Sequence, residues 1–214
     1  PSSTGGASIT GYKIEQSTNG GTTWSVVVVN TGSPTTLRVI SGLTNGTAYG
    51  FRVSAITRGG TGSPSAAAGA TPATIPGSPT VVTASPADRQ VTINWAPPVS
   101  DGGSSILGYT VERSSNGGST WTVIATSLAE TTFTDAGSLT NGSLYVYRVS
   151  AVNAFGTGVS SIPVIGIPAA RAAAPTNVTT YAGAEQVVLT WTAPSSTGGA
   201  PITGYQIESS FDDG

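Results

Sequence analysis

The sequence predicts an all-β protein made of tandem antiparallel β-sandwiches, and three observations support this prediction. A pattern of about 96 residues recurs along the chain, so that Trp95 and Trp191 lie 96 positions apart and Tyr12 and Tyr109 lie 97 positions apart. Within one period, short runs of alternating apolar and polar residues are separated by clusters of Gly, Pro, Ser and Asn, as in the strands and turns of a sandwich. Only 8% of the residues are charged and 29 are glycine, which favours strands and turns over helices.

The period is as long as a whole domain, not a turn of a solenoid. It divides the chain into a repeat over 1–71 that lacks its first two strands, a linker over 72–78, a complete repeat over 79–168, a linker over 169–174, and strands one to three of a further repeat over 175–214. The first six residues match Pro194 to Gly199, in the loop between strands two and three. Neither end piece is expected to bury its own core, because a sandwich needs both sheets.

The complete repeat is predicted to contain seven strands. The second strand carries Val91, Ile93 and Trp95 at alternate positions, which puts all three on one buried face because side chains switch sides at every residue of a strand. Two prolines then end this strand, since proline cannot donate to the ladder. The other strands are expected over 81–83, 106–113, 121–125, 131–134, 145–152 and 158–164, with Asn116-Gly117-Gly118 turning the chain between the third and the fourth.

Three stretches of the sequence resemble the fibronectin type III family, in the style of bacterial extracellular and surface proteins. They are the second-strand tryptophans Trp95 and Trp191, the Gly-Tyr-x-Val/Ile-Glu stretch around Tyr12, Tyr109 and Tyr205, and the Leu-Thr-Asn-Gly stretch that holds Leu43 with Tyr49 and Leu139 with Tyr145. The resemblance covers essentially the whole chain. It implies tandem seven-stranded immunoglobulin-like sandwiches with these residues in their cores, and a corner at which the phenols of Tyr49 and Tyr145 bond back to the backbone.

No catalytic, cofactor-binding or metal-binding residue is predicted. The chain has no Cys and no His, which removes thiol nucleophiles, the commonest general base and the usual zinc ligands. Carboxylate chemistry needs two groups that face each other across a substrate. Glu15, Glu112 and Glu208 instead recur at one repeat position, where they are expected to face solvent and protect a sheet edge. The single carboxylates expected in loops are Asp88, Asp101, Glu130 and Asp135.

Two hairpins, over 17–24 and 114–121, resemble the Ser-x-Asp-x-Gly-x-Thr-Trp box of sialidase-type propellers, with Asn in place of Asp. Ser210 to Gly214 begins a third version that keeps the Asp. The pattern is compatible with a glycan enzyme, but the simpler interpretation is a hairpin turn over which the tryptophan packs. Three asparagines fit the N-glycosylation pattern and are interpreted as turn residues: Asn45, Asn141 and Asn177.

Charge and hydropathy exclude two classes of partner. The eight basic and ten acidic residues are scattered singly, for a formal net charge of -2, so no basic stretch can follow a nucleic acid backbone. No apolar run approaches the roughly 20 residues of a membrane span. The expected partners are neighbouring repeats of the same chain or identical subunits, with a cell-surface or extracellular polymer as a further candidate. Phe155 or Tyr181, which the core pattern leaves unexplained together with Phe211, is expected to make interdomain contacts.

The expected function is that of a non-catalytic structural rod or fibre segment of an extracellular or cell-surface bacterial protein, acting in spacing, adhesion or filament formation. Proline and alanine in the linkers favour a rod because they limit bending. The alternative is a spacer in a secreted polysaccharide-degrading enzyme, where similar repeats occur. Two interpretations of the chain ends stay open: a window on a longer array, or a subunit whose strands near Val178 and Trp191 complete the open sandwich of the next copy.

Overall fold

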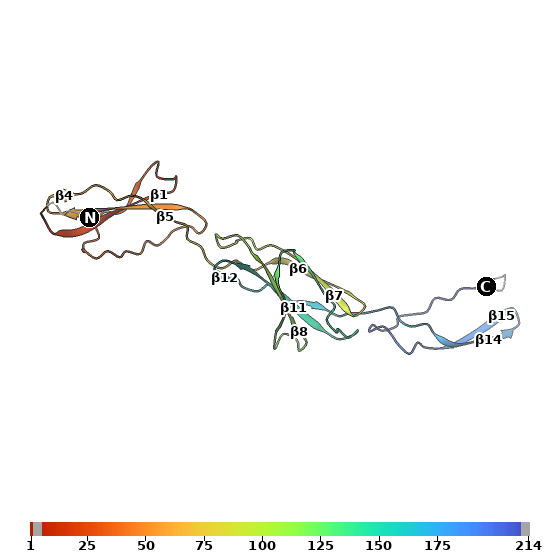
Figure 1. Ribbon diagram of the computed structural model, residues 1–214. Helices are drawn as coiled ribbons and strands as arrows, with labels where there is room; N and C mark the ends of the chain where they lie inside the picture. Colours follow the sequence, from red (N-terminus) through yellow and green to blue (C-terminus); the bar gives the residue numbers. More distant parts are fainter. Residues whose placement is uncertain (2–5, 211–214) are drawn as a thin grey trace. The chain divides into compact units, whose positions relative to one another are not determined.

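The computed structural model describes Pro1 and residues 6–210. All regular secondary structure in this part of the chain is β-strand (Figure 1). The chain divides into two compact units. Unit 1 contains residues 1–76, 100–106 and 153–156, and unit 2 contains residues 77–99, 107–152 and 157–214. No helix of the length and hydropathy needed to cross a membrane occurs among the described residues.

The first repeat contains one antiparallel sheet. Its strands are β1 (Ile9–Ser17), β2 (Ser25–Val28), β3 (Tyr49–Thr57), β4 (Gly60–Thr61) and β5 (Ala68–Ala70). The central pair is β1 and β3, and the register sets Ile14 opposite Val53. Residues 35–39, which correspond to strand β10 of the second repeat, do not form a strand. The reason is that β10 pairs with β7, and β7 has no counterpart among the described residues of unit 1.

The second repeat forms two sheets. One has the order β10-β7-β6, and the other has the order β12-β11-β8-β9 with β13 also paired to β11. The strands are β6 (Thr80–Ala87), β7 (Gln90–Ala96), β8 (Gly108–Ser114), β9 (Thr122–Leu128), β10 (Thr132–Asp135), β11 (Tyr145–Asn153), β12 (Gly156–Thr157) and β13 (Val164–Gly166). Trp95 of the first sheet meets Tyr109 of the second edge to face, with ring centroids 5.4 Å apart. The predicted all-β sandwich fold is therefore confirmed.

The strand boundaries differ most from the prediction at the first and the last strand of this repeat. Seven strands are predicted for this repeat, but the structure has eight because the last one is divided into β12 and β13. Between these two, the amides of Gly158 and Ser161 donate to carbonyls of β11, so the segment follows its neighbour without a regular ladder. The first strand covers residues 80–87, whereas the sequence predicts 81–83.

The core of the second repeat lies where the alternation of β7 and β8 places it. Val91 and Ile93 are fully buried and Trp95 is 5% exposed. From the opposite sheet, Tyr109 and Val111 are also buried. On β11 the predicted inward residues are all buried: Tyr145, Tyr147, Val149 and Ala151. β7 ends at Ala96, immediately before the two prolines, as the missing amide of proline requires.

A buried polar cluster in this repeat is not predicted by the sequence. Asp135, expected in a loop, is the last residue of β10 and is buried. Its carboxylate accepts hydrogen bonds from Arg113 Nη1 at 2.9 Å, from the Tyr147 hydroxyl at 3.1 Å and from the Gly137 amide at 3.0 Å. Burial, aided by the negative charge of Asp135, raises the pKa of Tyr147.

Alkaline pH is expected to destabilise the second repeat through Tyr147. A phenol with a raised pKa stays protonated in the folded state while it ionises in the unfolded chain above its ordinary pKa of 10.0. The free energy of unfolding therefore falls as pH rises beyond this value, and buried Tyr109, whose pKa burial also raises, adds an effect of the same sign. Urea unfolding between about pH 8 and about pH 11 measures the decline.

The variant Tyr147→Phe is expected to flatten this decline, because its ring cannot ionise. Tryptophan fluorescence reports on the second repeat in a chain that also carries Trp24→Phe and Trp191→Phe, since Trp95 and Trp121 are then the remaining tryptophans. An identical decline with and without the Tyr147 hydroxyl would show that another group titrates.

The last segment forms a single antiparallel hairpin, β14 (Thr176–Gly183) and β15 (Gln186–Thr192), drawn in blue in Figure 1. The sequence predicts a third strand around Tyr205, but the described residues after Thr192 form none. A strand needs a hydrogen-bonding neighbour. Strands that correspond to β9 and β11 have no counterpart in the described part of this segment, so the predicted strand has nothing to pair with.

Candidate functional site

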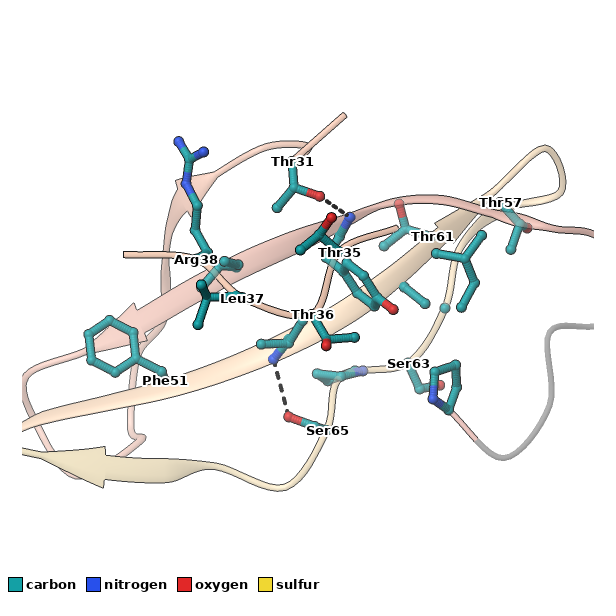
Figure 2. Close-up of a pocket in the computed structure, with 18 of the residues that line it drawn as sticks. Thr31, Thr35, Thr36, Leu37, Arg38, Phe51, Thr57, Thr61, Ser63 and Ser65 are labelled. Atoms are coloured by element: carbon teal, nitrogen blue, oxygen red, sulfur yellow. Dashed lines mark hydrogen bonds between the residues drawn. The ribbon is translucent and has the colours of Figure 1, made fainter. Parts of the chain in front are cut away.

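A hollow of about 1180 Å³ lies over one face of the β1 and β3 strands of the first repeat (Figure 2). Tyr12, Ile14 and Val53 contribute to its floor, and residues 35–38 and 59–65 contribute to its walls. Figure 2 shows two of the bonds that hold these walls: the Tyr12 amide donates to Thr31 Oγ1 at 2.9 Å and the Val53 amide donates to Ser65 Oγ at 3.1 Å. Arg38 is the only charged residue among those that line the hollow, so its surface is mainly apolar.

The second repeat shows what occupies this place in a complete sandwich. Val53 is 38% exposed, whereas Val149, at the same position of the second repeat, is fully buried. In the second repeat the corresponding face belongs to the β8 and β11 strands and is covered by the β10-β7-β6 sheet. The hollow therefore has the form of a site for a second sheet, and its size and openness do not suggest a pocket shaped around a small ligand.

The predicted core residues divide among three surroundings. Four are buried in the second repeat: Trp95, Tyr109, Leu139 and Tyr145. In the first repeat Tyr49 is buried, while Tyr12 and Leu43 are half-buried and line the hollow. In the last segment Trp191 is half-buried and Tyr205 is 42% exposed, with their ring centroids 5.1 Å apart. Tyr205 thus lies outside a core, because no second sheet covers β14 and β15 among the described residues.

The tyrosine corner that the resemblance implies is present in both repeats. The hydroxyl of Tyr49 accepts a hydrogen bond from the Thr44 amide at 3.0 Å, and the hydroxyl of Tyr145 accepts one from the Thr140 amide at 3.1 Å. Each bond ties the loop that precedes β3 or β11 to the first residue of that strand. The corners are structural, since both phenol oxygens are engaged with the backbone.

Both box-like hairpins are hydrogen-bonded turns. Ser114 Oγ accepts from the amides of Asn116 and Gly118, and it donates to Asn116 Oδ1. Asn116 Oδ1 also accepts from the Thr120 amide at 2.9 Å, while Nδ2 donates to Thr120 Oγ1 at 2.9 Å. A Cβ on Gly118 would lie 3.5 Å from the Trp121 ring, so the tryptophan packs over the turn as predicted. The same five bonds recur in the hairpin over 17–24.

The third version of the box, together with Phe211, lies outside the described residues apart from Ser210. In the two described versions every polar atom of the Asn side chain is used within the turn. The hairpins therefore act as folding elements.

Removing the side chain of Asn116 is expected to lower the free energy of unfolding of the second repeat by about 1–2 kcal/mol, because Asn116→Ala removes three side-chain hydrogen bonds from one turn. Asn116→Asp is expected to be close to neutral. A carboxylate can accept from the Ser114 hydroxyl and the Thr120 amide as Asn116 does, and the Thr120 hydroxyl, which accepts from Asn116, can turn and donate to it. Urea unfolding in the Trp24→Phe and Trp191→Phe background compares the two variants. Equal losses would mean that the turn does not depend on this acceptor.

The prediction that Glu15 and Glu112 face solvent at a sheet edge is wrong. β8 lies between β11 and β9, and the register sets Glu112 opposite Arg148, which donates to both carboxylate oxygens at 2.7 and 2.9 Å. The Arg148 guanidinium also lies 4.2 Å from the centroid of the Trp121 ring. The first repeat has the same arrangement: Arg52 donates to both carboxylate oxygens of Glu15 and lies over the Trp24 ring. Glu15 is only 7% exposed.

The arginine in the Tyr-x-Phe/Tyr-Arg-Val stretch is the sequence signal from which these ion pairs could have been predicted. In the first repeat this arginine is Arg52, and its hydrogen bonds to Glu15 are the main cause that lowers the pKa of the Glu15 carboxyl group. Glu208 differs from its two counterparts, since it is exposed and accepts a hydrogen bond from Gln206 Nε2 at 2.7 Å. The recurring glutamates are therefore cross-strand structural partners in the two repeats that keep an arginine opposite them.

The remaining candidate residues lie apart from one another. Asp88 accepts from the Asn141 side chain at 2.8 Å, and Asp101 accepts from the Gly103 amide at 2.7 Å. Among Pro1 and residues 6–210 no group of three or more His, Cys, Asp or Glu could hold a metal ion. Three of the candidates are exposed: Glu130, Phe155 and Tyr181. The interdomain contacts expected for Phe155 or Tyr181 stay predictions.

Comparison with known proteins gives one family and several relatives. The family model described as fibronectin type III domain matches residues 1–71 and 76–167. Slow-type myosin-binding protein C of Rattus norvegicus is 34% identical over 122 residues, which cover 56% of this chain and 20% of that protein. Myomesin-2 of Homo sapiens is 29% identical over 181 residues, which cover 79% of this chain and 12% of that protein. Exoglucanase B of Cellulomonas fimi is 34% identical over 193 residues, which cover 78% of this chain and 16% of that protein. The chain spans a fifth or less of the length of these relatives.

Proposed function

Because the chain belongs to the fibronectin type III domain family, we propose that it is a segment of an extracellular or cell-surface structural rod or fibre in which tandem sandwiches set a spacing. The family, together with the relatives Myomesin-2 and Exoglucanase B, supports the more general conclusion that the repeats form a structural or spacer module. The partners that fit this function are neighbouring repeats, identical subunits or a surface polymer.

The observation that carries the proposal is a linker whose backbone makes hydrogen bonds to the neighbouring loops at two successive positions. In unit 2, the Gly142 amide donates to the Pro168 carbonyl at 2.8 Å and the Ala170 amide donates to the Gly198 carbonyl at 2.7 Å. In unit 1 the same two bonds recur 96 positions earlier, from Gly46 to Pro72 and from Thr74 to Gly102. A linker held in this way has little freedom left to bend, which supports a spacer of defined reach.

The linker bonds of unit 2 depend on a close approach between two glycines. A Cβ on Gly199 would lie 2.5 Å from the Gly142 amide nitrogen, and Gly199 has a φ of +94°. A side chain at this position must push the backbone of residues 141 and 142 away. In unit 1 the corresponding approach is made by Gly103 to Gly46.

The stiffness of the linker can be measured within unit 2. The chain has no cysteine, so Glu130→Cys and Ala184→Cys place two spin labels at exposed positions of the second repeat and of the β14–β15 hairpin. Pulsed electron paramagnetic resonance is expected to give a narrow distance distribution. Adding Gly199→Ala is expected to broaden it.

Gly118→Ala is the matched control. Gly118 has the same φ of +94°, but its Cβ would meet only the Trp121 ring, at 3.5 Å. The backbone strain of the two substitutions is therefore alike, and only Gly199→Ala disturbs the linker. A distribution that is already broad in the parent chain would contradict the rod.

The extracellular location has a separate test. An antibody raised against residues 79–168 is expected to label intact cells of the producing organism, and external protease is expected to remove the label. Labelling that requires permeabilised cells would overturn this part of the proposal.

A second candidate function is a spacer in a secreted polysaccharide-degrading enzyme. The observation that favours it is the 34% identity to Exoglucanase B over 78% of this chain. The sequence of the complete gene separates the two candidates. A glycoside hydrolase domain in the same reading frame supports the enzyme spacer, and further sandwich repeats without such a domain support the rod.

A further inference from the structure

We propose that Asn153 fastens the linker that precedes the second repeat, so that this linker is held in place by the folded loops of the repeat that follows it. The proposal rests on the spacer function and deepens it, because it names the residue that sets the stiffness of one linker. Asn153 is the last residue of β11 and is 3% exposed.

The side-chain amide of Asn153 joins segments that lie far apart in the sequence. Its Nδ2 donates to the linker carbonyl of Thr74 at 2.8 Å. It also donates to the carbonyls of Asp101 and Ser104, in the loop between β7 and β8, at 2.8 and 3.4 Å. All of these residues belong to unit 1. The orientation of the amide is determined by Asn153 Oδ1, which accepts from the Phe155 amide at 2.8 Å, so the nitrogen faces the three carbonyls.

The three carbonyl oxygens need a donor in common. Carbonyl oxygens that converge on one point repel one another unless a hydrogen-bond donor lies between them. Asn153 supplies two N–H groups at this point. Without them, the linker is the segment expected to leave, because the loop that carries Asp101 and Ser104 is fixed at both ends by β7 and β8 of one repeat.

Other contacts place the linker against loops of the second repeat. The Thr74 amide donates to the Gly102 carbonyl at 2.9 Å, so residue 74 is hydrogen-bonded through both its amide and its carbonyl. A Cβ on Gly102 would collide with the Thr74 carbonyl oxygen, and a Cβ on Gly156 would lie 3.5 Å from a methyl group of Ile75. The order of this linker is therefore expected to depend on the folding of the repeat that follows it.

The first repeat has a different residue at the position of Asn153. Thr57 lies 96 positions earlier, at the end of β3. A threonine hydroxyl can donate one hydrogen bond, whereas the amide of Asn153 offers two N–H groups. The residue at this position is thus expected to tune how firmly a repeat holds its linker.

Amide hydrogen exchange, followed residue by residue by NMR, tests the proposal. The Thr74 amide reports on the linker, and the Trp95 amide, which donates to the Thr131 carbonyl at 3.0 Å, reports on the folded repeat. Asn153→Ala is expected to raise the exchange rate of the Thr74 amide about tenfold or more, because several hydrogen bonds are lost together. Asn153→Thr is expected to raise this rate less. The control Ala154→Ser, at an exposed position of the same loop, is expected to leave it unchanged.

Two results of this experiment would overturn the proposal. An unchanged exchange rate of the Thr74 amide in Asn153→Ala would show that the linker is held without Asn153. Equal increases at the Thr74 and Trp95 amides would show that Asn153 stabilises the second repeat as a whole and does not fasten the linker.

A second variant displaces the linker and leaves Asn153 in place. Gly102→Ala is expected to raise the exchange rate of the Thr74 amide. Gly117→Ala is the matched control, since Gly102 and Gly117 have φ of +78° and +71° and a Cβ on Gly117 would meet nothing within 4 Å. Adding Asn153→Ala to Gly102→Ala is expected to have little further effect, because the linker is already displaced. Effects of the two substitutions that multiply independently would overturn the proposal.

These measurements are separate from those of the proposed function. The spin labels report on the linker within unit 2, whereas Asn153 and Thr74 belong to unit 1. A linker of unit 2 that is stiff, with an exchange rate of the Thr74 amide that does not respond to Asn153, would overturn this proposal alone.

Discussion

Replacing Trp95 by alanine is expected to lower the free energy of unfolding of the second repeat by about 3–5 kcal/mol. The indole is 5% exposed, lies edge to face against Tyr109 and shares its strand face with Val91 and Ile93. Its removal leaves a cavity between the two sheets that the surrounding strands cannot close. The Trp95 Nε1 has no hydrogen-bond partner among the described residues, so the loss is one of packing alone.

The control is Trp191→Ala, at the same position of the repeat. Trp191 is half-buried and its ring contacts Tyr205, in a segment without a second sheet among the described residues. We expect this variant to change the stability of the second repeat by less than about 0.5 kcal/mol. Urea unfolding followed by tryptophan fluorescence measures both in chains that carry Trp24→Phe, and the Trp95→Ala chain also carries Trp191→Phe, so that only tryptophans of the second repeat report. Similar losses would mean that the two tryptophans do not differ in surroundings as the structure indicates.

The second large effect is expected at Asp135. Asp135→Ala leaves the buried Tyr147 hydroxyl without its acceptor and leaves Arg113 Nη1 with the Gly137 carbonyl alone, at a cost of about 3 kcal/mol in the free energy of unfolding. Asp135→Asn keeps one acceptor oxygen and is expected to lose less. The loss is expected to come from unpaired donors and not from volume, because the carboxylate is small.

Glu130→Ala is the control for Asp135, because Glu130 is an exposed carboxylate in the same repeat. A change within about 0.5 kcal/mol is expected there. Urea unfolding at neutral pH measures all three variants. If Asp135→Ala is no more destabilising than Glu130→Ala, the buried cluster does not stabilise the repeat.

The parts of the fold that depend on neighbours in the sequence were predictable from it. Alternation along 91–95 placed Val91, Ile93 and Trp95 on one buried face, and proline marked the end of that strand. The Asn-Gly-Gly turn followed from backbone freedom, since Gly117 and Gly118 both have positive φ. Local chemistry decides these features, so a single sequence is enough to find them.

The parts that depend on contacts distant in the sequence were not predictable in the same way. Asp135 meets Arg113 and Tyr147 across two sheets, and no local pattern marks it as buried. The pairing of Glu112 with Arg148 needs the register of β8 against β11. Residues 35–39 have a strand-like sequence but no partner strand, so tertiary context overrides their local preference.

The bonded linkers also determine how the chain takes up tension. A pull along the backbone loads each linker and the ladders of the adjoining strands in series, and the linker bonds from Gly142 and Ala170 are not part of a strand ladder. We expect these bonds to open at lower force than the paired strands β8 and β11, where seven residue pairs share the load. The chain would then lengthen slightly and recoil without exposing Trp95, which gives the array a reversible elastic response ahead of any unfolding.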